Sequence, residues 1–150
     1  MADFFISQSE ADILLKMKKQ SATEDEHEFP QAGERMEIPL LSINMREKFI
    51  LDLSRRQIDR IKITYQNRAK QIVVLARLDI GGSPHRNPDG EEISCPHLHI
   101  YREGYHDKYA YELPPELFDN PSDPWQMLHD FMKFCNIVKP PTFTKGLLYD

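Results

Sequence analysis

The 150-residue chain contains few cysteines, no long apolar run and no signal-peptide pattern. Its two cysteines, Cys95 and Cys135, do not form a Cys-x-x-Cys pair, which argues against a disulfide framework and a structural zinc site. No apolar run approaches the ~18 residues that a membrane-spanning helix needs. The first residues lack the basic start and the small-residue cleavage site of a secreted protein. We therefore expect a cytoplasmic protein that does not enter a membrane.

The chain also lacks a net positive charge, since its net charge at pH 7 is −5. A negative net charge argues against a general nucleic-acid-binding protein. The charge is uneven, since residues 46–70 hold eight Lys or Arg against three acids. Such a segment can bind phosphates or an acidic partner, and it equally fits the solvated faces of two strands and a turn. Residues 21–35 are rich in acids and have no periodicity, so we expect a mobile loop there. The candidate RNA-binding residues are Arg55, Arg56, Arg60, Arg86 and Arg102.

Two segments have helical patterns, one near each end of the chain. Ser7 and Glu10 have the spacing of a capping box in front of an apolar stripe, which predicts a helix near residues 7–20. Asp123 is a suitable N-cap, followed by proline and by apolar residues at helical spacing. A second helix is therefore predicted near residues 123–136.

The middle of the chain alternates between apolar and polar residues, as half-buried strands do. The clearest case is residues 71–80, in which Val74 and Leu78 are predicted to share one face. Arg77 and Asp79 fall on the other face. Short connections between successive strands predict antiparallel pairing. We expect the whole chain to form a single α+β domain, with both helices on the Val74 and Leu78 face of a twisted antiparallel sheet of about six strands.

A dense group of reactive side chains follows that strand. Residues 84–104 contain three histidines, two arginines, one tyrosine and four carboxylates. His97 and His99 have period-two spacing, which places them on one face of a strand, and Tyr101 continues the same spacing. We expect the strand that carries Arg77 to lie beside them. The candidate catalytic residues are His97, His99, His85, Arg77, Tyr101 and Asp79.

Three interpretations of this group are open. RNA cleavage without a metal needs a base, an acid and a cation for the phosphate, roles that suit histidine and arginine. A metal site is the second, because a His-x-His pair on a strand presents two imidazoles together, and His85 or Asp89 could close it. The third is structural, a polar sheet face beside a long hairpin whose turn lies at residues 87–90.

Two motifs resemble those of a family of uncharacterised small bacterial and phage-associated proteins. The pattern is R-x-D-x-x-G-x-x-H-x-N-P-D-G followed by H-x-H-x-Y-x-E-G, and the resemblance covers about residues 77–137. The resemblance implies that this region is a unit, and it brings no assigned activity. It suggests mobile-element or defence-related biology, in which small toxins, antitoxins and inhibitors are common.

The sequence thus leaves three functions, of which we prefer the first. The first is a toxin-like, metal-independent endoribonuclease that needs no cofactor and whose partners are RNA and an antitoxin. The second is a non-enzymatic phage or mobile-element protein that inhibits a host defence complex through its acidic surface. The third is a metal-dependent hydrolase or a metal-stabilised module. The oligomeric state stays open, a homodimer included.

Overall fold

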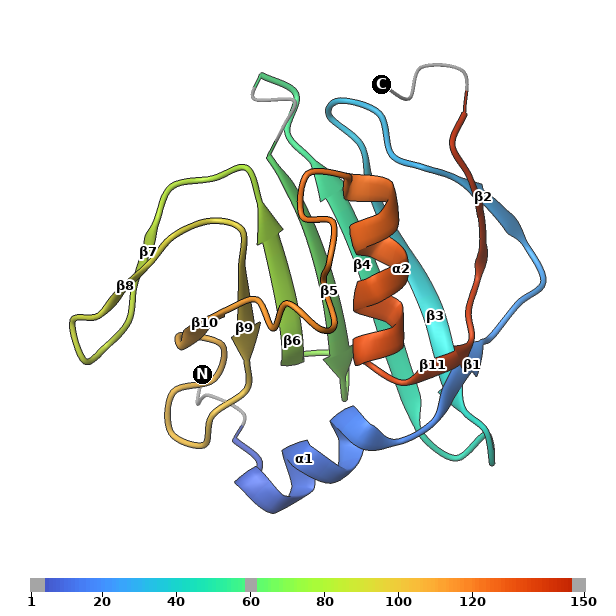
Figure 1. Cartoon of the computed structure of the whole chain (residues 1–150). Helices are drawn as coiled ribbons and strands as arrows, with labels where there is room; N and C mark the ends of the chain where they lie inside the picture. The colour runs from blue at the N-terminus through green and yellow to red at the C-terminus, as the bar shows by residue number, and fades with distance from the viewer. Residues whose placement is uncertain (1–4, 59–61, 147–150) are drawn as a thin grey trace.

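Two helices lie against a large sheet in the computed structural model, which describes residues 5–58 and 62–146 (Figure 1). Helix α1 (Gln8–Lys16) begins where the Ser7 hydroxyl accepts a hydrogen bond from the Glu10 backbone N–H. Helix α2 (Pro124–Phe134) begins where the Asp123 carboxylate accepts one from the Trp125 N–H. Both predicted N-caps are confirmed. Neither helix of the described chain is long and apolar enough to cross a membrane.

The main sheet has eight strands, two more than predicted. In spatial order they are β10 (Ala110–Glu112), β9 (His97–Ile100), β6 (Val73–Ile80), β5 (Ile63–Ala69), β4 (Lys48–Arg55), β3 (Arg35–Ser42), β1 (Lys19–Ser21) and β11 (Ile137–Lys139). Neighbours are antiparallel except β1 and β11, whose parallel pairing was not predicted. The prediction missed it because β1 and β11 are short and far apart in sequence, so no local pattern indicates their contact.

Two small ribbons accompany the main sheet. Strand β2 (Glu26–Glu28) pairs in parallel with β12 (Thr142–Thr144), so part of the acidic segment 21–35 is a strand. The mobility of that segment stays a prediction. Strands β7 (His85–Arg86) and β8 (Glu92–Ile93) form a hairpin beside β9 and β10 (Figure 1).

The core lies between the sheet and α2. Tyr65 and Leu78 are directly paired on β5 and β6, and Leu98 follows on β9; all three are buried. The Tyr65 ring contacts Phe131 of α2 at 6.2 Å between centroids, and its hydroxyl donates to the Pro124 carbonyl at 2.7 Å. The helix-facing side of the sheet is therefore the one that carries Leu78, as predicted.

Val74 does not share that side, which corrects the prediction. The pairing of β5 with β6 shifts between Asn67 and Arg68, so that Leu75 is an extra residue in β6. Leu75 is fully buried, whereas Val74 lies opposite Arg68 and is half-buried. A β-bulge of this kind reverses the alternation of the residues on one side of it. A strict alternation of residues between the two faces of β6 therefore places Val74 on the wrong face.

Lysine 19 connects the ends of the two helices. The predicted first helix would have included it, but α1 ends at Lys16 and Lys19 begins β1. Its ammonium donates to the carbonyls of Leu15 at 2.9 Å, Met17 at 2.9 Å and Cys135 at 2.7 Å. These carbonyls stand at helix C-termini, where cations are favoured. Burial lowers the pKa of Lys19 to about 8.

Candidate functional site

The face of the sheet opposite α2, here called the outer face, carries two polar rows across five strands. Directly paired residues point to the same side of a sheet, so the strand registers define each row. The first row is Glu37, Asp52, Gln66, Arg77 and His99. The second row is Arg35, Ser54, Thr64, Asp79 and His97. The two histidines therefore stand at one end of the two polar rows.

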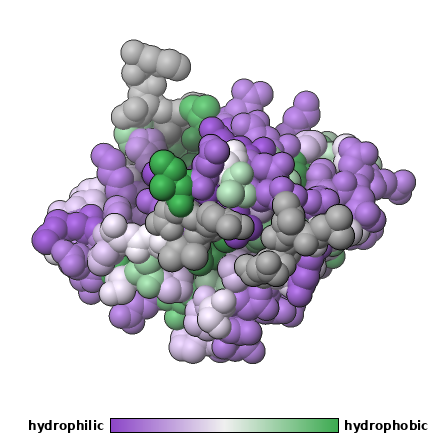
Figure 2. All heavy atoms as spheres, turned by 90° about the horizontal axis from the view of Figure 1, so that it is seen from above, coloured by the Kyte–Doolittle hydropathy of each residue, from purple (hydrophilic) through white to green (hydrophobic). Residues whose placement is uncertain are grey.

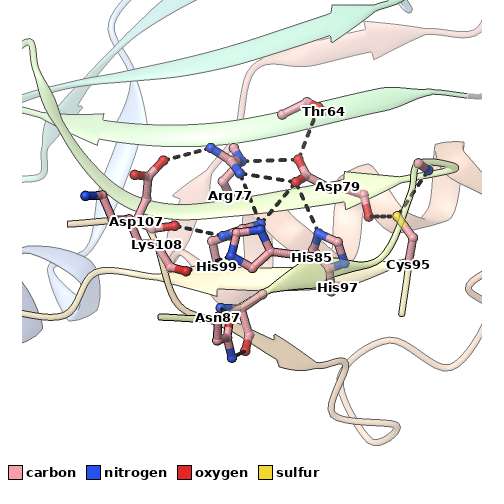
Figure 3. A network of polar contacts seen from close by, with 12 residues as sticks. Thr64, Arg77, Asp79, His85, Asn87, Cys95, His97, His99, Asp107 and Lys108 are labelled. Carbon is pink, nitrogen blue, oxygen red and sulfur yellow. Dashed lines mark hydrogen bonds and ion pairs between the residues drawn. The ribbon is translucent and has the colours of Figure 1, made fainter. Parts of the chain in front are cut away.

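Asp79 is the centre of the contacts at that end (Figure 3). Its Oδ2 atom lies 3.3 Å from His97 Nε2 and 3.1 Å from His99 Nε2. Its Oδ1 atom accepts hydrogen bonds from Arg77 Nε and from the Thr64 hydroxyl, each at 3.2 Å. Burial would raise the pKa of Asp79, but its contacts with the two histidines and the charge of Arg77 hold that pKa well below its ordinary value. These contacts therefore favour the ionised form of Asp79.

Arg77 is held by two carboxylates and one imidazole. Its Nη1 donates to Asp107 Oδ2 at 2.7 Å, and its Nη2 lies 3.3 Å from Asp79 Oδ2. The same Nη2 lies 3.0 Å from His99 Nε2. Sequence reasoning missed Asp107, because it stands in a turn with no motif of its own and only the fold brings it to Arg77.

Backbone carbonyls orient the three histidine rings. His97 Nδ1 lies 3.3 Å from the Ser94 oxygen, and His99 Nδ1 lies 2.8 Å from the Asp107 oxygen. On the hairpin, His85 Nε2 lies 2.7 Å from the Lys108 oxygen. A carbonyl oxygen only accepts, so each of these ring nitrogens carries a hydrogen.

The three histidines pack on one another. The ring centroid of His85 is 4.7 Å from that of His99 and 5.9 Å from that of His97. The side chain of Asn87 secures the hairpin, because its Nδ2 donates to the Ala110 carbonyl and its Oδ1 accepts from the Ala110 N–H. His97 is only 2% exposed and His99 0%. The structure brings the predicted histidines together and buries two of them.

Cys95 supports the backbone behind Asp79. Its Sγ atom donates to the Asp79 carbonyl at 3.2 Å and accepts a hydrogen bond from the Gly82 N–H at 3.2 Å. No sequence pattern connects this cysteine with Asp79, because the contact joins a loop to the end of a strand.

Tyr101 lies apart from this cluster, which corrects the prediction that it shares the histidine face. Strand β9 ends at Ile100, so period-two spacing no longer applies at the next residue. The Tyr101 hydroxyl accepts from the Ile6 N–H at 3.1 Å and donates to the Ile6 carbonyl at 2.8 Å. Its ring is part of the hydrophobic core. Tyr101 thus holds the segment before α1.

The four described arginines of the predicted RNA-binding set lie in different surroundings. Arg86 pairs with Glu92 on the β7–β8 hairpin at 2.9 Å, and the Arg102 guanidinium lies 4.1 Å from the Tyr109 ring centroid. Arg60 lies outside the described residues. Two of the five, Arg55 and Arg56, line a pocket on the outer face.

That pocket has a volume of about 490 Å³ and adjoins the Asp79 cluster through Thr64. Arg35 and Arg56 line it, together with Arg55, whose Nη1 donates to the Pro30 carbonyl at 3.3 Å. Asp52 is the acid among the described lining residues, and it pairs with Arg68 through bonds of 2.7 Å and 2.8 Å. The sequence indicated Arg55 and Arg56 through the basic segment, but Arg35 enters only because β3 pairs with β4.

Fold and site define an α+β domain whose open polar sheet face ends in a half-buried cluster of histidine, aspartate and arginine. Residues 6–137 match the family described as "Family of unknown function (DUF6978)", and the chain belongs to that family. No curated protein and no solved structure matches the chain. Membership of an uncharacterised family is therefore confirmed, while the motif pattern and the phage association stay predictions.

Proposed function

We propose that the outer face of the sheet binds single-stranded RNA through its phosphates, anchored in the pocket beside Thr64. The observation that carries the proposal is the charge of that pocket. Three arginines line it, and the carboxylate of Asp52 among its described lining residues is already neutralised by Arg68. A guanidinium can donate two parallel hydrogen bonds to a phosphate.

Further cationic character lies at the same end of the sheet. The Arg56 backbone N–H donates to the Lys62 carbonyl at 3.0 Å, and the Lys62 side chain packs beside Gly82 in the loop that follows Asp79. The cationic pocket and the Asp79 cluster are thus neighbours on one surface. Seen from above, at the ends of the strands, the coloured part of the surface is mainly hydrophilic (Figure 2). Binding of this kind depends on phosphates and is therefore weakened by salt.

Cleavage of the bound RNA is a separate step. The sequence predicts a metal-independent ribonuclease that uses His97 and His99, but both side chains are buried, and the Nδ1 atom of each ring is hydrogen-bonded to a backbone carbonyl. A general base must reach the proton that it removes, so this burial argues against direct proton transfer by either ring. Incubation of RNA with the protein in EDTA tests this step. Cleavage that is lost in a His97→Ala variant would support the ribonuclease function. If the RNA stays intact, RNA binding without cleavage remains as the proposed function.

Fluorescence anisotropy with a labelled single-stranded RNA tests the binding. Arg35→Ala and Arg56→Ala should each weaken binding by about 10-fold at low salt and lower the salt slope by about one. Arg46→Ala is the matched control, because it removes the same charge at the other end of the β3–β4 hairpin. An equal loss in Arg46→Ala, or no binding by the wild-type protein at low salt, would reject the proposal. Capture of an antitoxin or a host defence complex that survives both arginine substitutions would favour the inhibitor function.

A further inference from the structure

The side chains of Asp79, His97 and His99 place three metal-ligand atoms close together. One ligand atom from each residue lies within 4.8 Å of the other two. Asp79 Oδ2 is 3.3 Å from His97 Nε2 and 3.1 Å from His99 Nε2. Ligands bound to a tetrahedral or octahedral ion at about 2.0–2.2 Å stand ~3.0–3.6 Å apart. The two distances from Asp79 therefore match the edges of a coordination polyhedron.

The hydrogen bonds that the Nδ1 atoms make with backbone carbonyls determine which nitrogen of each ring has a lone pair available to a metal. The Nδ1 atoms of His97 and His99 face the carbonyls of Ser94 and Asp107, so Nδ1 carries the hydrogen in each neutral ring. The lone pair is then on Nε2, which faces Asp79. Metal-binding histidines are held in this way, with the second nitrogen donating to a backbone carbonyl or carboxylate.

A lone pair that faces a carboxylate oxygen needs a cation between the two. Arg77 provides one for His99, because its Nη2 lies 3.0 Å from His99 Nε2 and 3.3 Å from Asp79 Oδ2. The described part of the chain provides no corresponding cation between His97 and Asp79. A cation bound at this position would balance that pair.

We infer that Asp79 Oδ2 and the Nε2 atoms of His97 and His99 bind a divalent transition metal ion such as Zn²⁺. The inference goes beyond the proposed RNA binding and rests on different residues. Two imidazoles and one carboxylate form a ligand set that borderline ions such as Zn²⁺ accept readily. Of the three side chains, that of Asp79 is the one solvent reaches, because it is 21% exposed. The His85 ring packs against the site, with its centroid 4.7 Å from that of His99.

Arg77 competes with the ion. Its Nη2 contacts the same His99 and Asp79 atoms that the ion uses, and two cations do not share one pair of ligands. Arg77 has a second partner to move toward, because its Nη1 already lies 2.7 Å from Asp107 Oδ2. Loss of this guanidinium should therefore strengthen metal binding, the opposite of what loss of a ligand does.

Calorimetric titration of the EDTA-treated, full-length protein with Zn²⁺ tests the inference. We expect one ion per chain. Asp79→Asn and His97→Ala should each weaken binding by more than ~100-fold, beyond the ~10–100-fold that loss of an outer hydrogen-bond partner costs. Arg77→Gln should bind the ion more tightly than the wild-type protein. His129→Ala is the matched control, because this histidine lies on α2 with its Nδ1 at the Trp125 carbonyl, and it should leave binding unchanged.

Nitrogen NMR of the histidine rings provides a second measurement on the wild-type protein, independent of whether a variant folds. Zn²⁺ should shift the Nε2 resonances of His97 and His99 while each Nδ1 keeps its hydrogen, and the His129 resonances should not move. Failure of the folded wild-type protein to bind Zn²⁺ would overturn the inference. So would binding that is unaffected by Asp79→Asn and His97→Ala. RNA binding in EDTA is a separate measurement, so the failure of one proposal does not decide the other.

Discussion

Asp79 and His97 face each other across β6 and β9, with Asp79 Oδ2 3.3 Å from His97 Nε2. The same carboxylate contacts His99 and Arg77. One half-buried carboxylate therefore balances a guanidinium and organises two buried imidazoles at the end of the outer face. This arrangement makes Asp79 the residue whose loss should affect the cluster most.

Asp79→Asn should lower the free energy of unfolding by about 2–3 kcal/mol in EDTA, because the amide removes the charge that balances Arg77 and leaves buried polar partners imperfectly paired. Urea denaturation at neutral pH measures the loss. Asp119→Asn, a change of the same charge at an exposed position, should have little effect. Equal stability of the Asp79 variant and the wild-type protein would show that the cluster does not stabilise the fold.

Lys19→Met should lower the free energy of unfolding by about 2–4 kcal/mol, because the carbonyls of Leu15, Met17 and Cys135 lose their common donor in a buried site. Methionine keeps the length and the apolar part of the side chain. Lys18→Met removes the same charge from an exposed neighbour and should be nearly neutral in effect. The two variants are compared by denaturant unfolding at pH 7.

The stabilising effect of Lys19 should depend on pH. Burial lowers its folded-state pKa to about 8 from 10.5, so between these values the unfolded chain binds more protons than the folded one. The contribution of Lys19 to stability should therefore rise with pH across this window, by up to about 3 kcal/mol. The measurement is the difference in unfolding free energy between wild type and Lys19→Met at pH 7 and pH 10. Folded-state ionisation of Cys135 does not interfere, because burial raises its pKa to about 12. A difference that stays constant or shrinks would contradict the prediction.

Tyr101→Phe should destabilise the protein by about 1–2 kcal/mol, because the hydroxyl makes two hydrogen bonds to the Ile6 backbone. Hydrogen exchange at the Ile6 amide should accelerate, while Zn²⁺ and RNA binding should not change. Tyr111→Phe removes a hydroxyl from an exposed tyrosine and serves as the control. If Tyr101→Phe lost Zn²⁺ or RNA binding while its stability stayed unchanged, Tyr101 would be a functional residue and the prediction would be wrong.

Sequence-based placement of side chains was correct within regular strands and wrong where a strand ends or contains a bulge. His97 and His99 share a face because they lie within one short strand, and Arg77 and Asp79 lie beside them because the connecting loop favours antiparallel pairing. Tyr101 was misplaced because the strand ends one residue before it. Val74 was misplaced because a bulge depends on how β5 pairs with β6, which no spacing within β6 shows.

The sequence by itself determined the α+β class, the starts of both helices and the presence of a polar strand face with histidines, because caps and alternation are local properties of the chain. Only the tertiary structure decided that His85 covers His97 and His99, that Asp107 holds Arg77, and that Arg35 joins the cationic pocket. These contacts join residues from different strands, loops and turns, and their burial depends on how those segments pack. Residue order along the chain does not encode such distances directly. The sequence therefore predicted an exposed catalytic face, whereas the tertiary structure has a half-buried cluster.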